Sequence, residues 1–518
     1  MHATSPRPQV NPWLIALSVM LATFMEVLDT SIANVSLKHI AGSLSVSTDE
    51  STWVLTSYLI ANAIVIPTTA WFGRKFGRKN FLLFCVGIFT LSSFLCGVAT
   101  TLSMLLAMRV VQGAGGGALQ PIAQSILLES FPKEKHGQAM GVYGIGVVTA
   151  PILGPVLGGW ITDNYSWRWV FFINVPVGII ALRLMSRFIH DPLWLRNSRP
   201  ARLDVTGFAF MSLWLGCQEV LLDKGQEDDW FGSQFILLMA VLAVTGLAVF
   251  ILREMTAEKP LVDLRIMKNY NFTLGLALMF CAGITLYGLT AIIPLFLQSL
   301  MGYTALQSGL TMIPRGLGAL IAMPIAGRLV GKIQGRYLVA AGFLAFGAAS
   351  FIITRLSLDL TPWILFWPLF FTGVSIAFMF VPLNTLALGA LQPEQIGNAS
   401  GIFNLMRNVG GSVGISLVTT FAVRSAQAHQ TTLVANLTPY DPAYQAGLQT
   451  LATNFAAQGD AVTAQQQAVG AMYSTLVNQA NLLAYLDNFR LMAGLCLVCL
   501  VAAFCLKKAN VSRPVAAH

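Results

Sequence analysis

The stretch FILLMAVLAVTGLAVFILR at residues 235–253 holds a single charged residue, Arg253, close to its end. An α-helix needs about 20 mainly apolar residues to cross the hydrocarbon core of a bilayer, and this stretch meets that requirement. Similar stretches precede and follow it. The full set lies near residues 13–36, 53–72, 81–101, 104–128, 138–162, 169–189, 204–222, 235–253, 272–298, 305–330, 337–356, 362–388, 398–423 and 488–506. Because backbone groups in lipid must be satisfied within the segment, and these runs are too long for barrel strands, we predict an all-α polytopic membrane protein with fourteen transmembrane helices.

The composition excludes a soluble enzyme. Of the 518 residues, 55% are hydrophobic and 10% are charged, whereas soluble domains have about 25% charged residues. The first apolar stretch follows one basic residue, Arg7, and contains Glu26 and Asp29, which is unlike a cleaved signal peptide. The seven cysteines all fall within predicted spans, so we expect no extracytoplasmic disulfide and no zinc site.

The basic residues indicate the topology. The net charge is +9, and most lysines and arginines fall in the two ends of the chain and in alternate loops. This asymmetry is the positive-inside signal, so both termini are predicted to be cytoplasmic. The charge therefore reflects topology and implies no nucleic-acid partner. The exceptions are Lys38, Arg168, Lys224, Arg355, Arg424 and Arg490 on the other side, and Arg109, Arg183, Arg315 and Arg407 within spans.

The two parts of the chain carry a faint internal repeat. Pro121 and Pro132 are eleven residues apart and are followed by glycines at 137 and 141; Pro382 and Pro393 repeat the spacing, with glycines at 397 and 401. The loops AWFGRKFGRK (70–79) and GRLVGKIQGR (327–336) also match loosely. This pattern suggests two six-helix bundles with a transport site between them.

The expected division of the chain has three parts. Residues 1–189 form the N-terminal bundle, residues 190–270 form a basic linker and two inserted transmembrane helices, and residues 271–518 form the C-terminal bundle. The C-terminal bundle includes a long loop at 425–487 that lacks Lys and Arg, so this loop is expected outside the cytoplasm. The second half of the loop has helical composition and is expected to run into the last span as a helix.

Glu26 and Asp29 are the most informative residues of the first span. They are three apart, which puts both on one face of a helix. An ionised group at the bilayer centre costs about 2.5–3.5 kcal/mol on insertion scales, and burial and mutual repulsion favour the protonated form of a carboxyl. A carboxyl that gains and loses a proton is what proton coupling requires. The alternative is that both are structural partners of a buried arginine.

The fourth span carries a polar line on one face: Arg109, Gln112, Gln120 and Gln124. Arg109 is a plausible partner for Asp29 or Glu26, either as part of proton coupling or as a purely structural clamp. The glycines at 113 and 115–117 each cost about 1 kcal/mol of helix propensity against alanine, so they are not there to favour the helix. We expect that they let a neighbouring helix or a ligand approach closely. The glutamines are candidates for a substrate cavity.

The second half of the chain also has polar residues at membrane depth. They are expected either to line the cavity or to pair structurally, and the sequence leaves this open. They are Arg315, Asn384, Asn404 and Arg407, with Asn408 beside the last.

Two segments are candidates for conformational control. Lys75, Gly77, Arg78 and Lys79 form a turn between the second and third spans, which is either a topology anchor or a gate latch. In the fifth span, Gly154, Pro155, Gly158 and Gly159 predict a kinked helix with a smooth face for close packing.

The sequence lacks the motifs that several other activities would require. The chain has no GxxxxGK[ST] phosphate loop, so ion gradients rather than ATP are the expected energy source, and no HExxH or similar metal spacing occurs. A membrane-embedded hydrolase would need a nucleophile and base or a metal cluster at midplane, and a sensor would need a soluble signalling domain. Neither is present in the sequence. We therefore expect a secondary transporter with no cofactor, and no enzyme.

The sequence resembles the major facilitator superfamily, and within it the fourteen-span drug:proton antiporters of the EmrB type. The resemblance covers nearly the whole chain. One difference is that Arg74 stands where the family usually has an Asp in the turn before its basic residue. The matching segments are LATFMEVLDTSIANV (21–35), STWVLTSYLIANAI (51–64), RVVQGAGGGALQP (109–121), APILGPVLGGW (150–160), WRWVFFINVPVG (167–178), LLDKGQEDDWF (221–231) and PLFLQSLMGYTALQSGL (294–310).

The resemblance implies a major-facilitator-type fold and alternating access in the bacterial inner membrane. It implies efflux of amphipathic toxic compounds or drugs, driven by protons that enter from outside through Asp29 or Glu26. It also implies a periplasmic membrane-fusion adaptor and an outer-membrane channel as partners, with loop 425–487 as a docking segment. The alternative on the same fold is a dedicated exporter of one metabolite class, such as a fatty acid, bile salt or siderophore.

Overall fold

The computed structural model describes residues 11–192, 195, 203–258, 260–355, 362–389, 391–435, 437–456 and 461–507. In these ranges the regular structure is helical and no β-strand occurs. Fourteen helices, some of them joined pairs, are long and apolar enough to cross a membrane. This confirms the predicted all-α fold with fourteen transmembrane helices.

The first six spans form a bundle in which α1 packs against α8 and α10, and α6 packs against α3 and α5. The fourth span is broken between α6 and α7, where Pro121 in the first turn of α7 lacks the N–H that would continue the helix. The helices of this half are α1 (Pro12–Val35), α2 (Leu37–Leu44), α3 (Thr48–Val65), α4 (Thr69–Phe76), α5 (Arg78–Gly97), α6 (Leu102–Gly116), α7 (Leu119–Ser130), α8 (His136–Asn164), α9 (Trp169–Phe172) and α10 (Asn174–Phe188).

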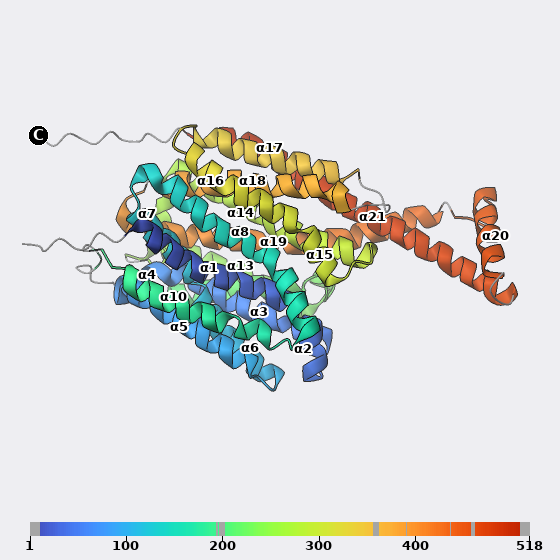
Figure 1. The fold of residues 1–518 in the computed structure, drawn as a ribbon, viewed down its shortest axis with the longest axis horizontal. Helices are drawn as coiled ribbons and strands as arrows, with labels where there is room; N and C mark the ends of the chain where they lie inside the picture. The colour runs from blue at the N-terminus through green and yellow to red at the C-terminus, as the bar shows by residue number, and fades with distance from the viewer. Residues whose placement is uncertain are drawn as a thin grey trace, which may run out of the picture.

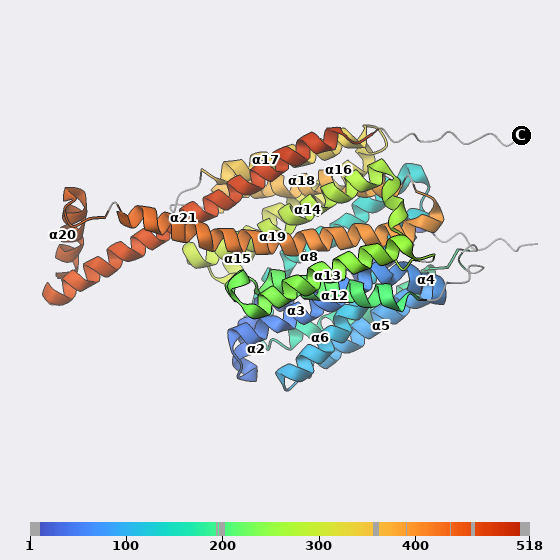
Figure 2. The ribbon, with the colours of Figure 1, turned by 180° about the vertical axis from the view of Figure 1, so that it is seen from behind.

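Two paired helices follow, α12 (Val205–Lys224) and α13 (Gln234–Thr256). Helix α12 contacts both α3 and α19, and Figure 2 shows α12 and α13 running along the boundary between the two halves. The helices of the second half are α14 (Tyr270–Leu295), α15 (Ala305–Thr311), α16 (Ile313–Leu329), α17 (Gly335–Ile353), α18 (Pro362–Leu388), α19 (Pro393–Ala435), α20 (Pro442–Ala456) and α21 (Ala461–Phe504). The domain boundaries at residues 189 and 270 stay predictions, and most of the basic linker at 190–203 lies outside the described residues.

The last two spans extend well beyond the bundle. Helices α19 and α21 have 43 and 44 residues, so each is roughly 65 Å long at 1.5 Å per residue, about twice the thickness of a bilayer core. Figure 1 shows their ends projecting from the body together with α20. The segment expected as a loop at 425–487 is therefore mainly helical, and its second half runs into the last span as one continuous helix, as predicted. The start of α1 and the end of α21 lie at the opposite end of the molecule; that this end is cytoplasmic stays a prediction.

Glycines let the two halves touch at the end of the bundle that holds the chain ends. A Cβ added to Gly137 of α8 would lie 2.6 Å from the carbonyl oxygen of Gly327 in α16, and a Cβ on Gly327 would lie 2.6 Å from that of Gly137. In the second half, a Cβ on Gly401 would lie 3.3 Å from the carbonyl oxygen of Ile66. The glycines of the sequence repeat thus face the opposite half in both repeats.

We predict that Gly137→Ala lowers the melting temperature of the purified protein, because the new methyl group overlaps a backbone oxygen that cannot rotate away. Overpacking of this kind costs about 1–3 kcal/mol. Gly494→Ala is the matched control, since a Cβ there meets nothing within 4 Å and alanine favours the helix. Equal melting temperatures for the two variants in a thermal unfolding assay would contradict the close contact.

Candidate substrate and proton site

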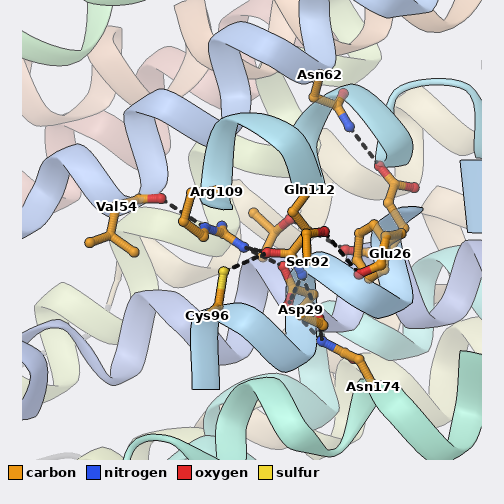
Figure 3. A network of polar contacts seen from close by, with 12 residues as sticks. Glu26, Asp29, Val54, Asn62, Ser92, Cys96, Arg109, Gln112 and Asn174 are labelled. Atoms are coloured by element: carbon orange, nitrogen blue, oxygen red, sulfur yellow. Dashed lines mark hydrogen bonds and ion pairs between the residues drawn. The ribbon is translucent and has the colours of Figure 1, made fainter. Parts of the chain in front are cut away.

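Asp29 is the centre of a buried polar cluster in the first half. Its carboxylate accepts hydrogen bonds from Arg109 Nη1 at 2.6 Å, Gln112 Nε2 at 2.9 Å and Asn174 Nδ2 at 2.6 Å. Asp29 and Arg109 are both fully buried. Figure 3 shows these side chains converging from α1, α6 and α10. Charge-assisted hydrogen bonds of this kind are the strong ones, so the cluster fastens three helices together.

Arg109 is held in place on its other side as well. Its Nε donates to the carbonyl oxygen of Val54 in α3 at 2.9 Å, and its guanidinium carbon lies 4.2 Å from the ring centre of Tyr58. The structure therefore pairs Arg109 with Asp29 rather than with Glu26. Asp29 does not line the main cavity in the described structure.

Glu26 has a different environment although it lies three residues before Asp29. Its two oxygens accept from neutral amides, Asn62 Nδ2 at 3.1 Å and Gln120 Nε2 at 2.7 Å. Glu26 also lines the main cavity, and in Figure 3 its side chain points away from the Asp29 cluster toward Asn62. Of the two carboxyls in the first span, Glu26 is thus the one placed to exchange a proton or a ligand with the cavity.

A hydrogen-bonded chain leads from Glu26 to the other half of the protein. Gln120 of α7 donates to Glu26 and accepts a hydrogen bond from Arg407 Nη2 of α19. One turn further along α7, Gln124 accepts from Asn404 Nδ2 at 2.7 Å. The charge on Glu26 is therefore coupled, through one amide, to a cation of the opposite half.

The main cavity has a volume of about 230 Å³ and is bordered by both halves and by α12. It lies in the part of the bundle away from the chain ends, because its lining comes from the second half of α1 and from residues 55–63 of the second span (Asp49–Phe76), which lie mainly in the first half of that span. Two carboxyls, Glu26 and Glu219, are its only charged lining residues in the described part of the chain. The other polar lining residues include Tyr58, Asn62, Gln120, Gln218, Tyr287, Thr290, Asn408 and Ser412.

The predicted cavity residues are distributed over several environments. Gln120 lines the main cavity, Gln112 belongs to the Asp29 cluster, and Gln124, Asn404 and Arg407 lie at the contact between the halves. Two more residues form their printed contacts within the second half: their hydrogen bonds go to neighbouring residues of that half. Arg315 donates to Thr290 Oγ1 at 2.8 Å and to the Leu286 carbonyl at 3.0 Å, and Asn384 donates to the Phe380 carbonyl of its own helix at 2.8 Å.

Glu219 is a cavity residue that the sequence analysis did not single out. The signal that could have found it is the one applied to the first span: it is an acidic residue inside an apolar stretch, 204–222. Tyr58, Asn62, Tyr287 and Ser412 carry no comparable signal, since uncharged polar residues occur throughout the spans.

The turn between the second and third spans is held mainly by contacts with other residues of the first half. Arg78 forms an ion pair with Glu129, and Asp191 accepts a hydrogen bond from the Lys79 N–H at 2.8 Å. Gly77 has φ +82°, a conformation that favours glycine. Lys75 lies over the ring of Trp71, 4.7 Å from its centre. Although Arg74 replaces the family's usual Asp, acidic partners for this turn come from Glu129 and Asp191.

The fifth span packs through small residues against α1 of its own half and against α15 of the second half. A Cβ on Gly154 would overlap Ser31 Oγ in α1, and a Cβ on Gly158 would lie 3.3 Å from Ile32. Gly159 faces the second half, where a Cβ would lie 3.8 Å from the Leu306 nitrogen. Pro155 continues this contact, since its carbonyl carbon would lie 3.4 Å from a Cβ on Gly309.

Comparisons with known proteins agree with this architecture. Residues 19–415 match the family model of the Major Facilitator Superfamily. The chain is 36% identical over 506 residues to the multidrug export protein EmrB of Escherichia coli K12, covering 96% of each chain. It is also 36% identical over 468 residues to the fatty acid resistance protein FarB of Neisseria gonorrhoeae, covering 90% of each. The solved structure of the proton:xylose symporter XylE is similar with a TM-score of 0.61 and 12% identity, covering 96% of each chain, which shows the fold alone.

We predict that Arg109→Gln strongly destabilises the protein, because it leaves the Asp29 carboxylate buried without its cation. Removing one partner of a buried pair costs about 3–5 kcal/mol. Adding Asp29→Asn to this variant removes the orphaned charge and should recover part of the loss. Thermal unfolding of the purified variants measures both effects, with the exposed Lys38→Gln as control. A melting temperature for Arg109→Gln equal to that of the control would show that the pair does not hold the helices together.

Proposed function

The chain belongs to the major facilitator superfamily and to its EmrB-type multidrug permeases, and on this premise we propose that it exports amphipathic toxic compounds or drugs by exchange for protons. It is a multi-pass protein of the bacterial inner membrane. The observation that carries the proposal is the position of Glu26, a carboxyl in the cavity that is linked through Gln120 to Arg407 of the other half.

Proton exchange at Glu26 provides a physical route from a gradient to a movement. An ionised Glu26 accepts strongly from the Gln120 amide, and this orients the amide oxygen toward Arg407. Protonation removes the negative charge and weakens the chain of hydrogen bonds across the contact between the halves. The two halves then separate more easily on the side of the chain ends, which is the movement that alternating access requires.

The sides of the membrane follow from the predicted topology. With both termini cytoplasmic, the contacts at Gly137 and Gly327 close the cytoplasmic end, and the cavity lies toward the outside. Protons enter from that side and reach Glu26, while substrate leaves. Each unit charge moved across 100 mV contributes about 2.3 kcal/mol, enough for a roughly fiftyfold outward gradient. Asp29 and Arg109 belong to this proposal as the fixed charge pair beside the proton site, and no cofactor takes part.

We predict that Glu26→Gln abolishes drug efflux driven by a pH gradient in proteoliposomes, because glutamine cannot carry the proton. Asp29→Asn should reduce both efflux and stability, since it also loosens the cluster around Arg109. Asp163→Asn, with a half-exposed side chain at the end of α8, is the control. Full efflux rates in the two single variants and in their double variant would mean that these carboxyls are structural.

The helical extension supports a proposal about partners. The ends of α19 and α21, with α20, project from the side of the molecule where the cavity lies, and exposed side chains such as Tyr440 and Tyr473 cover them. We propose that this extension docks a periplasmic membrane-fusion adaptor, which in turn leads to an outer-membrane channel.

Deletion of α20 tests this docking. Replacing Pro442–Ala456 by a short Gly-Ser linker should leave efflux in proteoliposomes unchanged, because no residue of α20 lines the main cavity. The same deletion should abolish drug resistance in cells that have an outer membrane. Unchanged cellular resistance would exclude the extension as the docking segment.

A dedicated exporter of one metabolite class, such as a fatty acid, bile salt or siderophore, is the second candidate function. The similarity to FarB supports it. Resistance measured against a panel of cationic and anionic compounds separates the two functions.

A further inference from the structure

The inserted helix α12 is part of the cavity wall. Leu215, Gln218 and Glu219 of this helix line the cavity together with residues of both halves. Helix α12 contacts α3 of the first half and α19 of the second half, and Figure 2 shows it at their boundary. A segment inserted between two complete bundles thus reaches the place where substrate would bind.

The end of α12 is fastened to α3 by polar contacts. Asp223 accepts a hydrogen bond from Thr56 Oγ1, and Lys224 Nζ donates to Thr52 Oγ1 at 2.5 Å. Lys224 also pairs with Glu227 at 2.6 Å. One turn earlier, Glu219 contacts the opposite half, where Ser412 Oγ of α19 lies 2.9 and 3.0 Å from its two oxygens. Helix α12 is therefore held on α3 while Glu219 faces α19 and the cavity.

Glu219 has fewer hydrogen-bond donors than a buried carboxylate needs. Its exposed fraction is 7%, and a serine hydroxyl carries one proton, so Ser412 can satisfy only one of the two oxygens at a time. Among the described residues Glu219 forms no ion pair. A buried charge without a partner is costly, so the ionised form of Glu219 calls for a cation from the cavity.

The neighbouring arginines do not supply that cation. Arg315 is bound to Thr290 and to the Leu286 carbonyl, and Arg407 is bound to Gln120. Neither lines the main cavity in the described structure. The remaining lining is largely apolar or aromatic, with Val27, Leu55, Leu59, Leu215 and Ile415 beside Tyr58 and Tyr287. Apolar walls around an unneutralised carboxyl suit an amphipathic molecule with one positive group.

We propose that Glu219 binds the positively charged group of an amphipathic organic cation, and that α12 thereby determines the charge of the substrates that the cavity accepts. The inference rests on the proposed export function, since it specifies the substrate class of the same cavity. Asp223 on α12 and Glu26 on α1 add negative charge around this position, whereas Lys224 is engaged with Thr52 and Glu227.

The test uses two probes of the same shape and opposite charge, tetraphenylphosphonium and tetraphenylborate, with triphenylphosphine oxide as an uncharged probe. Binding to the full-length purified protein is measured by equilibrium dialysis. We expect Glu219→Gln to weaken tetraphenylphosphonium binding at least tenfold, while tetraphenylborate and the uncharged probe bind as well as before or better.

Two matched variants separate charge recognition from packing. Asp228→Asn removes an equal charge just beyond α12, at an exposed residue outside the cavity lining, so it should leave all three affinities unchanged. Ser412→Ala removes the hydrogen bond to Glu219 but keeps the carboxyl, so any loss of tetraphenylphosphonium binding should be smaller than in Glu219→Gln and shared by the uncharged probe. Equal losses in Ser412→Ala and Glu219→Gln would overturn the proposal in favour of a structural role.

Further outcomes distinguish this proposal from proton-driven export. Unchanged tetraphenylphosphonium affinity in Glu219→Gln, or no saturable binding of this cation by the wild type, would overturn the role of Glu219 even if uncharged drugs are exported. If the charge-selective loss is found but a pH gradient drives no efflux by the wild type, the binding site stands and the export proposal fails.

Discussion

The buried ion pair between Asp29 and Arg109 is the contact on which the first half of the protein depends. An unpaired charge at the bilayer centre costs about 2.5–3.5 kcal/mol on insertion scales, so each group must have a partner. Asp29 takes three donors from α6 and α10, and Arg109 takes a backbone oxygen of α3. Because this cluster uses the available cation, Glu26 faces the cavity with neutral amides only. The Asp29–Arg109 pair thus joins helices of the bundle, and the neighbouring Glu26 carboxyl stays in contact with the cavity.

The contact between the two halves, unlike the interior of the first half, does not depend on an ion pair. Every ion pair among the described residues joins groups within one half or within the inserted segment. The halves meet instead through glycine backbones at Gly137 and Gly327 and through amides such as Gln124 and Asn404. Separating these surfaces breaks no ion pair among the described residues, although Arg407 loses its hydrogen bond to Gln120. Rigid bundles that meet without ion pairs are suited to rocking motions.

Much of the fold could be predicted from the sequence, because hydrocarbon thickness and backbone hydrogen bonding leave few alternatives for apolar stretches of about 20 residues. The environments of Glu26 and Asp29 were predictable only in part. The spacing of three residues put Glu26 and Asp29 near one face of the helix. The two side chains nevertheless point in different enough directions for Asp29 to contact Arg109 and for Glu26 to line the cavity. Which of the two carboxyls pairs with Arg109 depends on how α3 and α6 pack. No local sequence pattern indicates this packing. Likewise, the use of Gln124 and Asn404 at the contact between the halves requires both bundles to be assembled.

The position of α12 gives the insertion a physical rationale. The cavity wall includes residues of α3 and residues of α19. Helix α12 lies against both helices, and its fastening to α3 through Asp223 and Lys224 ties it to the first half. Its single polar contact with α19 among the described residues, from Ser412 to Glu219, involves the one α12 carboxyl that faces the cavity. A ligand or proton that neutralises Glu219 therefore acts on the hydrogen bond that joins α12 to α19.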